Sequence, residues 1–353
     1  MSGTFYKEYL RSTRRRLVFA AALLILLVVL IGAGISLGSA DLSVLDSWRA
    51  VAAGLFPGMV EMPPHLAGTS AVPIVWELRL HRVLFAVAAG FGLAIAGTVM
   101  QGILRNPLAS PFTLGIASAA ACGAAVAIVL GAGVLGGEYL IVGDAFLFAL
   151  AASGAVYGMA RARGMSAGAM ILAGIALMYL FSAVTSLLQY LGTTDQTEAV
   201  VFWMFGSLDR TAWGTLGIVT LLLAVLTPWM VLRSWDLNAL AEGDEVAAGL
   251  GINVDRTMAT FMVLSSFITA AIICFTGTIG FIGLVAPHIT RMVVGGDHRI
   301  LIPAAGLTGA VLLLAADSLA RTVLSPTILP VGIMTAFIGI PFFLYLFFSR
   351  EYA

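Results

Sequence analysis

Long segments without a single Asp, Glu, Lys or Arg dominate this sequence. The first covers residues 17–40, and the others are 83–104, 106–137, 145–160, 164–194, 211–232, 257–290, 300–316 and 322–349. A helix needs about 20 apolar residues to cross a bilayer, and most of these segments reach or exceed that length. The composition agrees, because 60% of the 353 residues are hydrophobic and only 10% are charged. The chain is therefore predicted to be an all-α, polytopic membrane protein and not a water-soluble enzyme.

Several of these segments are too long for a single crossing. At about 1.5 Å per residue, 257–290 would form a helix about 50 Å long. It contains Gly277, Gly280, Gly283 and Pro287, which favour a break into a full span and a shorter one. Dividing the long segments in this way predicts about ten spans: 17–38, 82–104, 113–134, 139–160, 168–190, 212–233, 256–276, 281–294, 300–322 and 330–349.

The distribution of basic residues gives these spans an orientation. Cytoplasmic loops carry an excess of Lys and Arg. With the N-terminus inside, thirteen of the 18 basic residues face the cytoplasm: Lys7, Arg11, Arg14, Arg15, Arg16, Arg105, Arg161, Arg163, Arg233, Arg256, Arg291, Arg299 and Arg350. We therefore expect residues 1–353 to form one transmembrane domain with both termini cytoplasmic. Residues 1–16 would be a basic cytoplasmic segment, and 39–78 an external loop.

The predicted cytoplasmic loop at 236–251 has an unusual pattern. It reads as two short helices, with Asp236 and Asp244 as N-caps, Gly243 between them and Gly251 at the end. A linker lying along the lipid headgroups is one interpretation, but such helices usually carry basic residues. Here the polar residues are acidic, and an anionic inner leaflet would repel them. The acidic pattern favours a protein partner.

Several motifs resemble one known family. In chain order they are RLHR at 79–82, GTVMQG at 97–102, RNPLASP at 105–111 with LGI at 114–116, LAEGDEVAAGLG at 240–251, GTIGFIGLVAPH at 277–288, and GDHR at 296–299 with ADSLAR at 316–321. Together they resemble the permease subunits of type II ABC importers, which take up ferric siderophores, haem and cobalamin. One departure is His81, where the family pattern usually has proline, which loosens the expected geometry at the start of the second helix.

The resemblance implies a set of partners in a prokaryotic cell membrane. It implies a second permease subunit, identical or paralogous, two cytoplasmic ABC ATPase subunits that bind ATP and Mg, and an external substrate-binding protein. Lys7 is the only lysine, so this chain cannot contain a Walker A loop, and we expect no catalysis and no bound cofactor here. The four histidines show no metal-ligand spacing, and a net charge of +0 argues against nucleic acid.

The resemblance also assigns roles to particular residues. The coupling helices that contact the ATPase would use Leu240, Glu242, Gly243, Asp244, Glu245, Ala247, Leu250 and Gly251, with Leu240 and Leu250 as the apolar anchors. Docking of the binding protein would use Arg79, Arg82 and Arg321. The alternative is that Arg79 and Arg82 anchor a helix end and that Arg321 pairs with Asp317 one turn earlier.

Two further groups have a structural alternative. Asn106, Pro107 and Leu108 are candidates for the cytoplasmic gate, although Pro107 by itself also explains a helix stop. Helix breaking and close packing are expected of Gly277, Gly280, Gly283 and Pro287.

Two other classes of protein fit less well. An ion-coupled secondary transporter needs ionisable groups within the membrane, and the only acidic residues in the predicted spans are Asp317 and Asp144, the latter near the outer end of its span. An intramembrane enzyme needs a catalytic motif such as Gly-x-Ser-x-Gly or His-Glu-x-x-His, and the sequence contains neither. The cargo stays open. A ferric siderophore is the first candidate, and haem, cobalamin or molybdate are the alternatives within the family.

Overall fold

The computed structural model describes residues 2–38, 42–57, 59–60, 63 and 70–348. In this part of the chain there are seven helices long and apolar enough to cross a membrane and three shorter apolar helices, and no strand occurs. The ten elements are α1 (Ser2–Ser36), the continuous helix Ala71–Leu104 that ends in α4 (His81–Leu104), α5 (Ile116–Leu130), α6 (Leu140–Ala162), α7 (Ala167–Leu191), α9 (Trp213–Leu232), α12 (Val254–Thr276), α13 (Ile282–Val294), α14 (His298–Thr322) and α15 (Val331–Phe348). The prediction of an all-α fold with about ten spans is confirmed.

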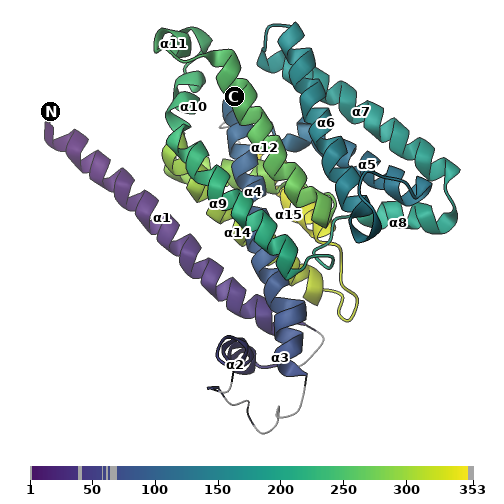
Figure 1. Cartoon of the computed structure of the whole chain (residues 1–353). Helices are drawn as coiled ribbons and strands as arrows, with labels where there is room; N and C mark the ends of the chain where they lie inside the picture. The colour runs from purple at the N-terminus through teal and green to yellow at the C-terminus, as the bar shows by residue number, and fades with distance from the viewer. Residues whose placement is uncertain (1, 39–41, 58, 61–62, 64–69, 349–353) are drawn as a thin grey trace.

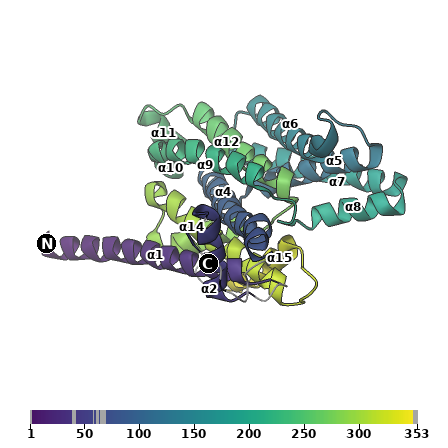
Figure 2. The ribbon, with the colours of Figure 1, turned by 60° about the horizontal axis from the view of Figure 1, so that its bottom comes forward.

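The centre of the bundle is formed by α4 and α14. Of their apolar stretches, 78% and 72% are buried, against 22% for α7 and 17% for α9. α4 packs against α12, α13 and α14, whereas α5, α6 and α7 pack on one another and lie together beside this core with the short helix α8 (Thr194–Met204) (Figures 1 and 2). α7 and α9 therefore present apolar faces to lipid or to a partner subunit.

Glycines allow the central helices to touch backbone to backbone. A Cβ at Gly97 of α4 would lie 1.8 Å from the carbonyl oxygen of Gly283 in α13, and a Cβ at Gly90 would lie 2.3 Å from that of Gly309 in α14. Pro287 has no N–H, so the Gly283 carbonyl lacks its usual donor four residues on. The missing side chain at Gly97 lets α4 approach this freed oxygen.

The break between the seventh and eighth spans lies at residues 277–281. α12 ends at Gly277, which has φ +71°, and α13 starts after Phe281, which has φ +66°. Gly277 cannot be replaced easily, because a Cβ there would lie 2.1 Å from the carbonyl oxygen of Trp203. The expectation that Pro287 helps to break the helix is wrong, since α13 continues through it.

Two predicted boundaries also differ from the structure. The second long helix starts at Ala71, not at 82, and a further helix, α2 (Val44–Leu55), lies within the predicted 39–78 loop. Much of the rest of that loop is outside the described residues. α1 starts at Ser2, so the basic segment 1–16 continues the first helix. The second helix can include Arg79 because its guanidinium binds backbone oxygens of α1.

The acidic loop forms a helical hairpin, α10 (Ser234–Ala241) and α11 (Asp244–Gly249). The sequence predicted Asp236 and Asp244 as the N-caps of these helices. In the structure both lie within the first turns instead. Gly243 between them has φ +119°, and Gly251 after them has φ +84°, which is backbone geometry that favours glycine. Figure 1 shows the hairpin at the end of the bundle near the start of α1, opposite α2 and α3 (Ala71–Pro73).

Candidate functional site

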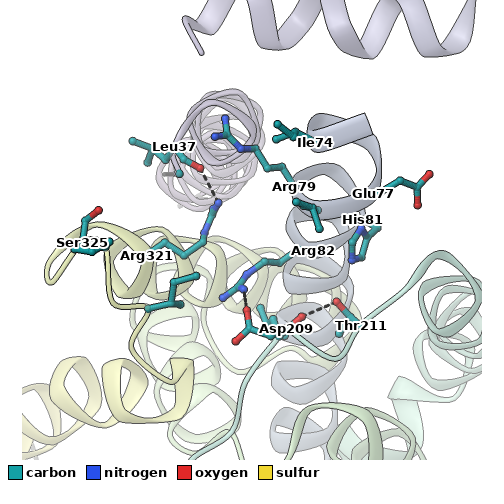
Figure 3. Close-up of a pocket in the computed structure, with 15 residues that line it drawn as sticks. Leu37, Ile74, Glu77, Arg79, His81, Arg82, Asp209, Thr211, Arg321 and Ser325 are labelled. Carbon is teal, nitrogen blue, oxygen red and sulfur yellow. Dashed lines mark hydrogen bonds and ion pairs between the residues drawn. The ribbon is translucent and has the colours of Figure 1, made fainter. Parts of the chain in front are cut away.

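A charged cavity of about 370 Å³ lies at the end of the bundle opposite the hairpin. The three predicted docking arginines, Arg79, Arg82 and Arg321, all line it, together with Asp209 from the loop before α9 (Figure 3). Two of these arginines come from the second long helix and the third from α14, so the packing of the central helices brings together residues more than 200 positions apart. We call this group the mouth cluster.

Asp317 of α14 pairs with two of these arginines, and we include it in the mouth cluster. Its side chain is fully buried and accepts hydrogen bonds from Arg82 Nε at 3.0 Å and Arg82 Nη2 at 2.8 Å. Arg321 Nε lies 3.0 Å from the other carboxylate oxygen. The pairing of Arg321 with Asp317 is therefore confirmed. Two guanidiniums share this buried carboxylate, and Arg82 has a second carboxylate partner in Asp209.

The C-terminal end of α1 supplies further acceptors. Arg79 donates to the carbonyl oxygens of Ile35 and Ser36 at 3.2 and 2.8 Å, and Arg321 donates to those of Gly34 and Leu37 at 3.0 and 2.9 Å. The last carbonyls of a helix have no intrahelical donor and carry partial negative charge. The two arginines therefore cap α1 and hold it against α4 and α14.

The mouth cluster is largely closed to solvent. Arg79, Arg82 and Arg321 are only 5–8% exposed, whereas the Asp209 side chain is 53% exposed and contacts Arg82 Nη1 (Figure 3). The three arginines predicted from the sequence lie together, and the alternative in which Arg321 pairs with Asp317 within the chain is what the structure shows. Nothing in the sequence signals the Arg82–Asp209 contact, because its two residues are far apart in the chain.

At the opposite end, the hairpin exposes most of its charge. Glu242, Asp244 and Glu245 are exposed, and Leu250 is 69% exposed. The predicted anchor Leu240 is instead only 1% exposed, in the core of this chain, and Ala247 is fully buried. Leu240 is thus unable to serve as a free apolar anchor, and it holds the hairpin on the bundle.

The predicted gate residues lie next to this hairpin. α4 ends at Arg105, which has φ +47°, and the Asn106 Oδ1 then accepts the N–H of Leu108 at 2.9 Å in a tight turn. Leu108 is 49% exposed. Arg105 Nη2 lies 2.6 Å from Asp244 Oδ1, so an ion pair joins the start of α11 to the turn at the end of α4. This contact was not predicted from the sequence.

A second unpredicted contact joins α10 to the start of α14. Asn238 Nδ2 donates to Asp297 Oδ1 at 2.9 Å, and Asn238 Oδ1 accepts the backbone N–H of His298 at 2.9 Å. The same oxygen lies 2.8 Å from His298 Nδ1, and because it can only accept, Nδ1 must carry the proton. The Arg299 guanidinium, followed by the Asn238 amide, holds the pKa of the Asp297 carboxyl well below its usual range, so this acceptor stays ionised at neutral pH.

The two intramembrane acids have local partners. Asp317 is bound by Arg82 and Arg321, and Asp144 Oδ1 accepts the N–H of Val134 at 2.9 Å. A carboxylate that carries a proton or Na⁺ across the membrane must exchange its ligands with water or substrate. These contacts fix both acids within the fold and give no support to ion coupling.

The ten apolar helices of the described residues, with an exposed acidic hairpin at one end and an arginine cluster at the other, have the architecture of a multi-pass membrane protein. Residues 24–349 match the FecCD transport family, and the chain belongs to that family of ABC importer permeases. It is a protein of the inner membrane.

Individual relatives differ in the cargo that their names state. The chain is 38% identical to the hemin transport system permease protein of Yersinia pestis, covering 93% of this chain and 95% of that one. It is 37% identical to the cobalamin import system permease protein of Halobacterium salinarum over 80% and 75% of the two chains. A solved structure of a metal-chelate type ABC transporter in an inward-facing conformation is also similar, with a TM-score of 0.79, 30% identity, and coverage of 95% of this chain and 99% of that one.

Proposed function

We propose that the chain passes a metal chelate, with a ferric siderophore as the first candidate, from an external binding protein to the cytoplasm by alternating access. Two copies of this chain would enclose the path, and two partner ATPases would bind ATP and Mg and drive the cycle. Family membership supports the transport role. The exposed acidic hairpin is the observation that carries the ATP-driven mechanism, because it offers a soluble partner three exposed acids, Glu242, Asp244 and Glu245, close together on two short helices that project from the bundle.

The end of the bundle with the hairpin is assigned to the cytoplasm, and both termini with it. The excess of basic residues in the loops predicted to lie on this side supports the assignment. In the same orientation, the mouth cluster faces the binding protein.

The hairpin would transmit ATPase closure to the gate. Glu242, Asp244 and Glu245 would face basic residues of the ATPase, and the exposed Leu250 would supply apolar contact. Leu240 and Ala247 would keep the hairpin attached to the bundle. The Arg105–Asp244 ion pair supports transmission, because it joins α11 directly to the turn that contains Asn106, Pro107 and Leu108.

The mouth arginines would receive carboxylates of the binding protein. Arg binds a carboxylate through two parallel hydrogen bonds, which fixes orientation as well as charge. Asp209 already contacts Arg82, so docking would replace this internal carboxylate with one from the partner. The exposed position of Asp209 supports such an exchange, since only its side chain has to move.

The cargo class rests on the relatives. Hemin, cobalamin and Fe(3+) dicitrate, which appear in the names of three of them, are all metal chelates. Mass spectrometry of the ligand that purifies with the cognate binding protein tests this assignment, and a ligand without a chelated metal would contradict it.

Reconstitution tests the mechanism. In proteoliposomes with the cognate ATPase and binding protein, uptake should require ATP and should persist when an ionophore removes ion gradients.

The same system tests the coupling role of the hairpin. Gly243→Trp should keep ATP hydrolysis but lose uptake, because it changes the angle between α10 and α11. Gly164→Trp is the matched control, since Gly164 also has positive φ and no neighbour within 4 Å of the position that a Cβ would take, but lies between α6 and α7. Uptake at the wild-type level in Gly243→Trp would contradict the coupling role.

A further inference from the structure

A second polar cavity lies between the end of α9 and the start of α12, near the hairpin. It has a volume of about 560 Å³ and is lined by Arg233, Asp236, Arg256 and Thr257, with Trp229 at its apolar side. Its charged residues are not among those proposed to contact the ATPase or to form the gate, although Gly251 at the end of the hairpin also lines it. Arg233 Nη2 pairs with Asp236 Oδ2 at 2.7 Å, whereas Arg256 makes no ion pair with any residue that the structure describes. One positive charge is left over, so the cavity attracts an anion.

The surface next to the cavity indicates what kind of anion. One face of α9 carries Ile218, Leu221 and Val225, which are 55%, 68% and 61% exposed, while the opposite face is buried. Trp229 follows at helical spacing and is 37% exposed, and Arg233 follows one turn later. The order of these side chains along α9 matches the layers of one membrane leaflet. The apolar residues correspond to the acyl chains, the tryptophan to the interface, and the arginine to the headgroups.

The dimensions of this face agree with a single leaflet. Ile218 and Trp229 are eleven positions apart, which is about 16 Å of helix at about 1.5 Å per residue. The hydrocarbon core of a bilayer is about 30 Å thick, so one leaflet contributes about 15 Å. An acyl chain lying along the exposed face of α9 would therefore bring its headgroup to the level of the cavity.

We propose that this cavity binds the headgroup phosphate of an anionic phospholipid whose acyl chains lie along the exposed face of α9. Arg256 and Arg233 are the phosphate ligands, and Asp236 fixes the Arg233 guanidinium. Basic pockets between transmembrane helices bind anionic headgroups by this chemistry. A free phosphate ion would satisfy the arginines but would leave the apolar face unused, which is why we assign the site to a lipid. α10 starts at Ser234, directly after Arg233, so the bound lipid would also stabilise the joint between the membrane and the hairpin.

Native mass spectrometry of the full purified chain, without ATPase or binding protein, tests the proposal independently of transport. Titration with phosphatidylglycerol and with phosphatidylcholine should give at least about tenfold tighter binding of the anionic lipid, and Arg233→Gln/Arg256→Gln should remove this preference. Arg161→Gln/Arg163→Gln is the matched control, because it removes two exposed arginines at the end of α6, outside the cavity, and should keep the preference.

Three outcomes would overturn the proposal. They are an unchanged lipid preference in the cavity variant, an equal loss in the control, and displacement of phosphatidylglycerol by inorganic phosphate alone at similar concentration. The single variant Arg256→Gln covers the case in which the double variant does not fold. Arg256 has no ion pair to lose within the described residues, so its replacement should weaken phosphatidylglycerol binding severalfold while leaving the apparent Tm of the lipid-free protein unchanged.

Discussion

The two ends of the α4–α14 pair differ in whether their charged side chains are buried or exposed. At the mouth, Asp317 is fully buried and its two arginine partners are nearly so, whereas Glu242, Asp244 and Glu245 of the hairpin at the other end are exposed. Removing charges from water is costly unless they are paired and hydrogen-bonded. The mouth cluster therefore has to support the fold whatever else it does, while the hairpin is free to be shaped by a partner.

A charged motif in a membrane protein can therefore stabilise the fold or be available to bind a partner. Both groups stand out in the sequence because charge is rare in this chain. Only the structure distinguishes charge that is already satisfied within the molecule from charge that is available to another protein. For the mouth arginines, the proposed docking would require an exchange of partners, but Glu242 and Glu245 of the hairpin have no ion pair among the described residues and would require only contact.

The largest expected effect comes from Asp317→Asn, which keeps the shape but removes the countercharge from Arg82 and Arg321. Breaking a buried ion pair by neutralising one partner costs about 3–5 kcal/mol. The apparent Tm in detergent should fall by many degrees. Asp195→Asn, at an exposed position in the first turn of α8, is the control and should leave it nearly unchanged. Equal Tm values for the two variants would show that the buried Asp317 contributes no more to stability than an exposed acid does.

Gly97→Ala should disrupt the close contact between α4 and α13, which lies between the mouth cluster and the hairpin. The added Cβ would sit 1.8 Å from the Gly283 carbonyl oxygen, so α4 and α13 must separate. Overpacking of this kind costs about 1–3 kcal/mol. Gly158→Ala in α6 has no atom within 4 Å of the new Cβ and should be neutral or slightly stabilising. A loss of thermal stability in Gly158→Ala as large as that in Gly97→Ala would argue against close packing as the cause.

Much of this fold could be predicted from the sequence, because a helix that crosses a membrane needs a long apolar segment that is easy to recognise. The absence of charge over 20-residue segments fixed the spans, and the short span 281–294 corresponds to α13, Ile282–Val294. The start of the second helix was missed by about ten residues. Arg79 and Glu77 look like loop residues in isolation, and only the α1 carbonyls that bind Arg79 explain how the helix can include it.

The candidate sites were predictable as sets of residues but not as contacts. Arg82 and Asp317 are 235 positions apart, and no periodicity links them. In the hairpin, the sequence pattern does not tell which apolar face meets the bundle, so Leu240 was expected at the partner surface although it is buried in this chain. Pairing across helices is decided by three-dimensional packing, which a single sequence does not encode locally.

At the hairpin end, Asn238→Ala should loosen the attachment of α10 to α14, with a smaller effect on stability than the two variants above. It removes the bridge from α10 to Asp297 and His298, and a lost buried hydrogen bond costs about 1–2 kcal/mol. Hydrogen exchange should become faster in α10 and in the first turn of α14, with little change in the rest of α14. The control is Asn253→Ala, which removes the N-cap of α12 and should loosen that helix start alone. Unchanged exchange in α10 would mean that the bridge does not hold the hairpin.

The smallest effect on stability should come from the Arg105–Asp244 pair. Its side chains are 34% and 52% exposed, and water and salt screen such pairs, so a double-mutant cycle with Arg105→Gln and Asp244→Asn should give a coupling energy below about 1 kcal/mol. Uptake should respond more strongly than stability, because this ion pair joins α11 to the turn proposed as the gate. We expect more ATP hydrolysed per substrate transported in either variant. Asp236→Asn breaks another ion pair, at 2.7 Å, that does not reach α4, and it should leave this ratio unchanged. If Asp236→Asn raised the ratio as much as Asp244→Asn, transmission would depend on hairpin charge in general and not on the contact with α4.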